Sequence, residues 1–194
     1  MDYFKPPPKP PVNITRVILI AIGAVALATM LGAIAWIVYN AVQFTDYQDP
    51  SYKFAVHYPS KWQVIKAPQA GVAVVFLSPK ESALDVFREN INVTVQPVPD
   101  DIASIKTFSQ TITEQMKAVF QSNIKILEDK PFVFSGRQGH RMVFEAHQPD
   151  RLKAMVVWTI RKGQAYILTY ITTIRKYPQS SSKVEEVLKS FQLK

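Results

Sequence analysis

The longest apolar stretch of the chain runs from Val17 to Val38 and contains no charged residue and no proline. At about 1.5 Å rise per residue, a helix of this stretch would be roughly 33 Å long, enough to cross a hydrocarbon core of about 30 Å. A secretory signal peptide has a shorter apolar region of about 7 to 15 residues. We therefore expect residues 16–43 to form an uncleaved transmembrane helix. Cleavage after Ala35 is the alternative that the spacing leaves open.

The residues flanking this stretch set its expected orientation. Lys5, Lys9 and Arg16 precede it, and the positive-inside rule places such residues in the cytoplasm. We expect residues 1–15, which are rich in proline, to be a cytoplasmic tail and residues 44–51 to be a short tether. The rest of the chain would then lie in the periplasm or the thylakoid lumen.

Alternating apolar and polar residues, typical of half-buried strands, recur through the remainder of the chain. Expected strands cover residues 52–58, 62–66, 72–77, 91–95, 124–127, 132–134, 137–147, 153–161 and 164–173. Apolar residues recur at helical spacing over residues 100–121 and 181–191, and residues 161–164 have the composition of a hairpin turn. Residues 52–194 are therefore predicted to form an α+β domain, an α/β/α sandwich with a central antiparallel sheet.

The net charge of +8 belongs to the C-terminal part, because residues 1–49 carry three basic and three acidic residues. A basic domain can contact anionic headgroups or an acidic partner, although the same charge also serves solubility. We expect no nucleic-acid partner, because the expected topology places the domain across the membrane from the cytoplasm. The chain has no cysteine and hence neither disulfides nor thiolate metal ligands.

The sequence contains no established motif for phosphate, dinucleotide or catalytic metal binding. His57, His140 and His147 are the only imidazoles, and the last two would point to opposite faces of one strand. Glu128 and Asp129 fall in an expected turn and suit at most a weak calcium site. We therefore expect no catalytic residues, no cofactor and no enzyme activity, and we assign no metal ligands.

Basic residues gather at the ends of the long strands expected at residues 153–161 and 164–173. Because ends of adjacent antiparallel strands meet in space, these residues are predicted to form a basic edge that binds a partner. The alternative is an ordinary solvated rim. The candidate residues are Arg151, Lys153, Arg161, Lys162, Arg175 and Lys176.

An ordered set of short segments resembles the PsbP family, which includes an extrinsic subunit of photosystem II. Residues 54–62, FAVHYPSKW, are similar to the family's opening F-x-V-x-Y-P-x-x-W. The other similar segments are residues 90–94, 135–139, 165–169 and 190–191. Together they cover nearly all of residues 50–194.

The resemblance implies an α/β/α sandwich shared with a nuclear Ran-binding protein, and a non-catalytic role in binding or assembly. On this basis we expect a membrane-anchored protein that binds, assembles or stabilises a membrane protein complex, with photosystem II as the candidate. The apolar stretch departs from the family's photosystem subunits, so no metal-binding residues are carried over. The alternative is an envelope or periplasmic domain that binds a small molecule or lipid in a pocket between sheet and helix.

Overall fold

The structure, a computed structural model, describes residues 25–37, 44–83, 85, 87–147 and 151–194. It divides into two compact units, residues 1–42 and 43–194.

In the first unit, residues 25–37 form a helix. The expected tail and the two ends of the expected membrane span, residues 16–24 and 38–43, lie outside the described residues. Within the described ranges, no helix is both long enough and apolar enough to cross a membrane.

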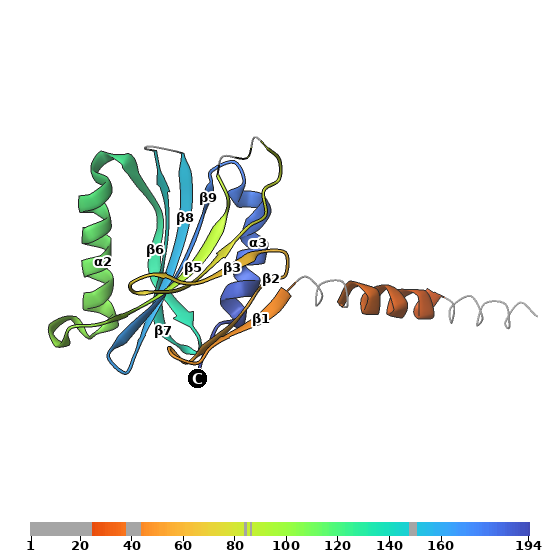
Figure 1. The fold of residues 1–194 in the computed structure, drawn as a ribbon, viewed down its shortest axis with the longest axis horizontal. Helices are drawn as coiled ribbons and strands as arrows, with labels where there is room; N and C mark the ends of the chain where they lie inside the picture. Colours follow the sequence, from red (N-terminus) through yellow and green to blue (C-terminus); the bar gives the residue numbers. More distant parts are fainter. Residues whose placement is uncertain (1–24, 38–43, 84, 86, 148–150) are drawn as a thin grey trace, which may run out of the picture. The chain divides into compact units, whose positions relative to one another are not determined.

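The second unit is built on a seven-stranded antiparallel sheet with the strand order β3-β4-β5-β9-β8-β7-β6 (Figure 1). Its strands are β3 (Gln63–Gln69), β4 (Val72–Leu77), β5 (Asn90–Pro97), β6 (Ile124–Phe134), β7 (Arg137–Ala146), β8 (Leu152–Arg161) and β9 (Gln164–Thr173). A smaller sheet has the order β1-β2-β10. It consists of β1 (Phe44–Asp49), β2 (Phe54–Pro59) and β10 (Gln192–Leu193).

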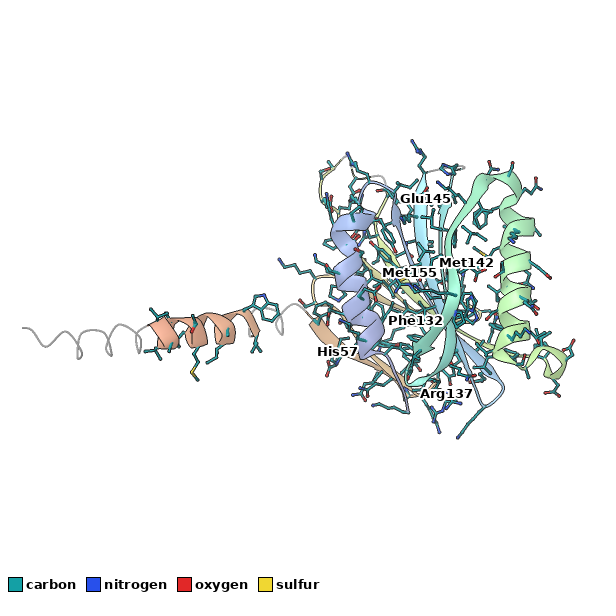
Figure 2. The ribbon with its side chains drawn as sticks, turned by 180° about the vertical axis from the view of Figure 1, so that it is seen from behind. His57, Phe132, Arg137, Met142, Glu145 and Met155 are labelled. Carbon is teal, nitrogen blue, oxygen red and sulfur yellow. The ribbon has the colours of Figure 1, made fainter. Side chains whose placement is uncertain are left out.

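Two helices cover opposite faces of the large sheet, α2 (Ile105–Phe120) and α3 (Tyr177–Ser190) (Figure 1). Short 3₁₀ turns, η1 (Asp100–Ile102) and η2 (Gln121–Asn123), flank α2. The alternation of β7 and β8 sends Met142 toward α2 and Met155 toward α3, as Figure 2 shows. The small sheet packs on the α3 side, where Phe54 and Val56 join the same apolar cluster as Met155. The predicted sandwich of helices around an antiparallel sheet is thus confirmed.

Local chemistry explains where α2 begins and how β8 turns into β9. Ser104, the residue before the helix, accepts a hydrogen bond from the backbone N–H of Thr107 at 3.0 Å and so caps its N-terminus. Lys162 and Gly163 have φ angles of 51° and 71°. Two left-handed residues in succession match the right-handed twist of the flanking strands. The predicted hairpin is therefore confirmed.

The segment expected to be a tether is largely a strand. Residues Phe44–Asp49 form β1, which pairs antiparallel with β2. Tyr47 is 8% exposed, and its ring lies 5.4 Å from that of Phe76. Asp49 accepts hydrogen bonds from the N–H groups of the next turn, including that of Tyr52 at 2.9 Å. Asp49 thus stabilises the turn that joins β1 to β2.

The two short strands expected at 124–127 and 132–134 are one strand, β6, with 11 residues. No turn interrupts the chain at Glu128. Instead, the pairing of β6 with β7 shifts register between Ile126 and Glu128, and the strand continues past this point. Pro131 is tolerated because β6 is the last strand of the large sheet, and an edge strand has one side without backbone partners.

Alkaline pH should destabilise the domain through a buried phenol. Burial raises the pKa of Tyr170 to about 12, and its hydroxyl donates a hydrogen bond to Ser180. Since an unfolded tyrosine titrates near pH 10, this stability is complete below about pH 10 and is lost as the pH approaches about 12. We expect the free energy of unfolding, measured with urea at fixed pH values, to fall over this interval. Tyr170→Phe should reduce the slope, and an unchanged slope would contradict the assignment.

Candidate functional site

A groove of about 730 Å³ runs between α2 and the edge strand β6. It exists because the apolar face of α2 packs over β7 and β8, through residues such as Phe108 and Met116, and leaves the polar flank of the helix beside β6. The helix contributes Ile105, Lys106, Ser109, Gln110, Thr113, Glu114 and Lys117. The strands contribute Asp129, Pro131, Phe132, Val133, Gln138, Gly139 and His140.

The base of the groove holds an imidazole between a carboxylate and an indole. Nε2 of His140 contacts Oδ1 of Asp129, and the hydroxyl of Thr113 donates to the other carboxylate oxygen at 3.3 Å. The His140 ring also stacks on Trp158, with centroids 5.0 Å apart and 23° between the planes. Register explains the grouping, since His140 lies opposite both Pro131 on β6 and Trp158 on β8.

Trp158 connects this group to α2. Its side chain is 0% exposed, and Nε1 donates a hydrogen bond to the hydroxyl of Ser109 at 3.0 Å. That hydroxyl in turn donates to the backbone carbonyl of Ile105 at 2.6 Å. The buried polar atoms beneath the groove are therefore paired within the protein.

The groove gathers Ser109, His140 and Asp129, three residue types that hydrolases use. A catalytic triad needs the hydroxyl hydrogen-bonded to the imidazole, and here the Ser109 hydroxyl is bonded to Trp158 and Ile105 instead. Among the described residues, no group of three or more His, Cys, Asp or Glu side chains is placed to hold a metal ion. The Ser109 hydroxyl, bonded to these two partners, is therefore not placed as the nucleophile of a Ser–His–Asp triad.

The three histidines lie apart. His57, on β2, sits 3.2 Å from Asp46 on β1 at the surface of the small sheet. His147 follows the end of β7 and is exposed. Only His140 reaches the groove.

Glu128 and Asp129, the residues considered for calcium, point to opposite faces of β6, as neighbours in a strand do. Asp129 faces α2 and contacts His140. Glu128 faces α3 and lies 3.0 Å from Arg141, which also pairs with Glu185 of α3 at 2.7 Å. The two carboxylates therefore do not converge on one ion.

The six basic candidates do not share one edge of the sheet. Arg161 and Lys162 lie at the β8–β9 turn, and the other four lie at the opposite end of these strands (Figure 1). Strands of 10 residues separate the two groups by about 30 Å. The expectation that the six residues form a single basic edge is therefore wrong, because they lie at both ends of the hairpin formed by β8 and β9.

Several of these cations are already engaged. Lys176 pairs with Glu81 at 2.9 Å and with Asp85 at 3.4 Å. Lys153 lies 4.4 Å from the centre of the Tyr177 ring and 3.7 Å from Glu145. Arg161 contacts the backbone carbonyl of the C-terminal residue. A role of the six residues in partner binding stays a prediction.

Sequence reasoning missed the groove residues of α2. A usable signal was Ser109, a polar residue on the apolar face of the predicted helix, which is 5% exposed in the structure. A buried hydroxyl requires a partner, and Trp158 supplies it.

Comparison with known proteins agrees with this architecture. A solved cyanobacterial PsbP from Synechocystis is 16% identical, with a TM-score of 0.61 over 79% of this chain and 94% of that one. The Ran-binding protein Mog1p of Saccharomyces cerevisiae is 10% identical, with a TM-score of 0.52 over 78% of this chain and 96% of that one. LpqN of Mycobacterium tuberculosis, involved in cell envelope biogenesis, is 7% identical, with a TM-score of 0.54 over 77% and 90%.

These likenesses show a common fold. No curated protein matches the chain. The PsbP family model, in contrast, matches residues 42–193, which is most of the chain. The protein therefore belongs to the PsbP family.

Proposed function

We propose that this protein is a membrane-anchored, non-catalytic subunit that binds and stabilises a membrane protein complex, with photosystem II as the first candidate. The observation that carries the proposal is the order of the chain. A PsbP domain over residues 42–193 directly follows an uncharged stretch, 17–38, that is long enough to span a bilayer. Such an anchor would confine the domain to the membrane surface and raise its effective concentration toward membrane partners.

The proposed topology follows from the Lys and Arg residues before the apolar stretch. Residues 1–15 would lie in the cytoplasm, and the PsbP domain in the periplasm or the thylakoid lumen. The start of β1 at Phe44 leaves only residues 39–43 between the apolar stretch and the folded domain. That short connection supports a domain held close to the bilayer.

Isolation of the full chain from its native membranes would test this proposal. The protein would be solubilised in a mild detergent, purified, and its neighbours identified by mass spectrometry. Reproducible recovery of subunits of one membrane complex is the expected result. A matched preparation of residues 43–194 alone, which lacks the apolar stretch, should lose most of these neighbours. Recovery of the full chain alone, or with unrelated envelope proteins, would contradict the proposal.

The groove beside α2 favours a second candidate function, binding of a small molecule or lipid. Its volume of about 730 Å³ falls within the range of about 300 to 1,000 Å³ typical of ligand sites. It also combines apolar walls with a few polar groups, as such sites do. Binding of a ligand at the groove, located by amide chemical shifts in nuclear magnetic resonance spectra, would support this function.

A further inference from the structure

The outer wall of the groove is apolar and exposed. Val133 is 71% exposed on β6, on the same face of the strand as Pro131. Ile105 of α2 continues the apolar lining on the helix side. An apolar ligand lying along this wall would remove such surface from water, at about 25 cal/mol for each Å² buried.

An apolar group at the base of the groove would leave the hydrogen bonds of Asp129 and Ser109 intact. Asp129 is already in contact with His140 and Thr113, and Ser109 is already bonded to Trp158. Covering these groups therefore breaks no hydrogen bond within the protein, and the remaining cost is the water lost by the Asp129 carboxylate, whose side chain is 32% exposed.

The rim on the helix side carries three charges, Lys106, Glu114 and Lys117. None of them forms an ion pair within the part of the chain that the structure describes. Glu114 lies three residues before Lys117, so the two are neighbours on the helix surface and offset each other. Lys106 lies about two turns away, in the first turn of α2, where the helix dipole also favours an anion.

We infer that the groove binds an organic anion with an apolar tail, with the anionic group at Lys106 and the tail along Pro131 and Val133. This inference rests on the second candidate function and names its ligand class. Gln110, one helical turn after Lys106, lies beside the proposed position of the anionic group and offers amide hydrogens to it. The two carboxylates of the lining are each paired or offset, Asp129 by contacts with His140 and Thr113 and Glu114 by Lys117, whereas Lys106 has no such partner among the described residues.

Residues 43–194 are suitable for the test because they fold on their own. In the described structure, both apolar clusters are made of residues between 44 and 193. The match to cyanobacterial PsbP covers 94% of that chain. A chain that consists of little more than this domain is therefore folded.

The experiment compares decanoate with nonyltrimethylammonium, which both carry a nine-carbon alkyl tail and have opposite head-group charge. Both would be titrated into residues 43–194 by calorimetry, below the concentrations at which they form micelles. Amide chemical shifts would locate the bound ligand. We expect decanoate to bind with one-to-one stoichiometry, to shift the amides of Ser109, Val133 and Gly139, and to bind at least tenfold more tightly than the cation.

Matched variants test the two ends of the proposed ligand. Val133→Asp should weaken decanoate binding at least tenfold. Val119→Asp should change it less than twofold, because Val119 is 75% exposed on the same helix that lines the groove but lies outside the groove. Lys106→Glu should weaken binding about tenfold, and Lys125→Glu, an exposed position of β6 outside the groove, should have no effect.

The outcomes separate the inference from the function on which it rests. If decanoate and the cation shift the groove amides with equal affinity, ligand binding stands and the anion preference is overturned. Shifts confined to other surfaces, or no binding, would overturn both. Cooperative unfolding in urea would show that each variant is folded. If Val133→Asp does not fold, the effect of Lys106→Glu on decanoate binding decides whether the inference holds.

Discussion

Phe191→Ala is expected to lower the free energy of unfolding of residues 43–194 by about 3 to 5 kcal/mol, the usual cost of truncating a buried aromatic residue. Phe191 is 2% exposed and follows directly after α3. Its ring stacks on Phe54 of β2 at 5.3 Å and on Phe134 of β6 at 4.7 Å. One side chain thus connects α3, the small sheet and the edge of the large sheet.

Urea unfolding followed by circular dichroism would measure this loss. Leu127→Ala is a suitable control, because Leu127 is 42% exposed on β6 and its truncation should cost less than about 0.5 kcal/mol. A loss below about 1 kcal/mol for Phe191→Ala would show that the stacked rings are not a main source of stability.

Trp158→Ala is expected to destabilise the domain by a similar amount, about 3 to 5 kcal/mol. The indole fills the layer between β8 and α2, supports the His140 ring and donates to Ser109. Its removal leaves a cavity and takes away the N–H donor to the buried Ser109 hydroxyl, which keeps only its bond to the Ile105 carbonyl.

Trp158→Phe separates these two contributions. It keeps an aromatic ring beneath His140 but removes the N–H donor, so its cost should be well below that of Trp158→Ala. Urea unfolding would give the cost of both variants. The chemical shifts of the His140 ring would report the loss of stacking in Trp158→Ala. Equal costs for the two variants would mean that the hydrogen bond to Ser109, and not the ring volume, dominates.

The elements that the sequence predicted best are long and regularly patterned. β7, β8 and β9 occur close to their expected bounds, because each has many residues that obey one period. α2 ends within one residue of its expected end but begins at Ile105, five residues after the expected start at 100. α3 begins at Tyr177, four residues before the expected start at 181. Pro178 and the serines after it resemble a loop, yet proline is well tolerated in the first turn of a helix.

Short elements that depend on distant partners were not predictable in the same way. β10 is a strand of two residues that exists because Gln192 and Leu193 pair with β2, more than a hundred residues earlier. β1 was missed for the same reason, since its place in the small sheet is decided by tertiary contacts. Of the small sheet, only β2 was predicted, as the strand expected at residues 52–58.

The groove depends on three separate segments, and this explains why it could not be read from the sequence. Ser109, Asp129 and Trp158 each have an ordinary local explanation, as a helix, strand or core residue. Their convergence follows from the register of β6, β7 and β8, which includes the shift between Ile126 and Glu128. Without that shift, Asp129 would face α3 and would not meet His140.

The same irregularity of β6 bears on how copies of this protein behave toward one another. An exposed edge strand can pair with the edge of a second molecule and begin aggregation. Here the register shift interrupts a regular ladder, Pro131 lacks an N–H to donate, and Lys125 and Lys130 would place like charges together. These features disfavour edge-to-edge aggregation of the protein through β6. The short apolar segment around Val133 nevertheless stays accessible to solvent.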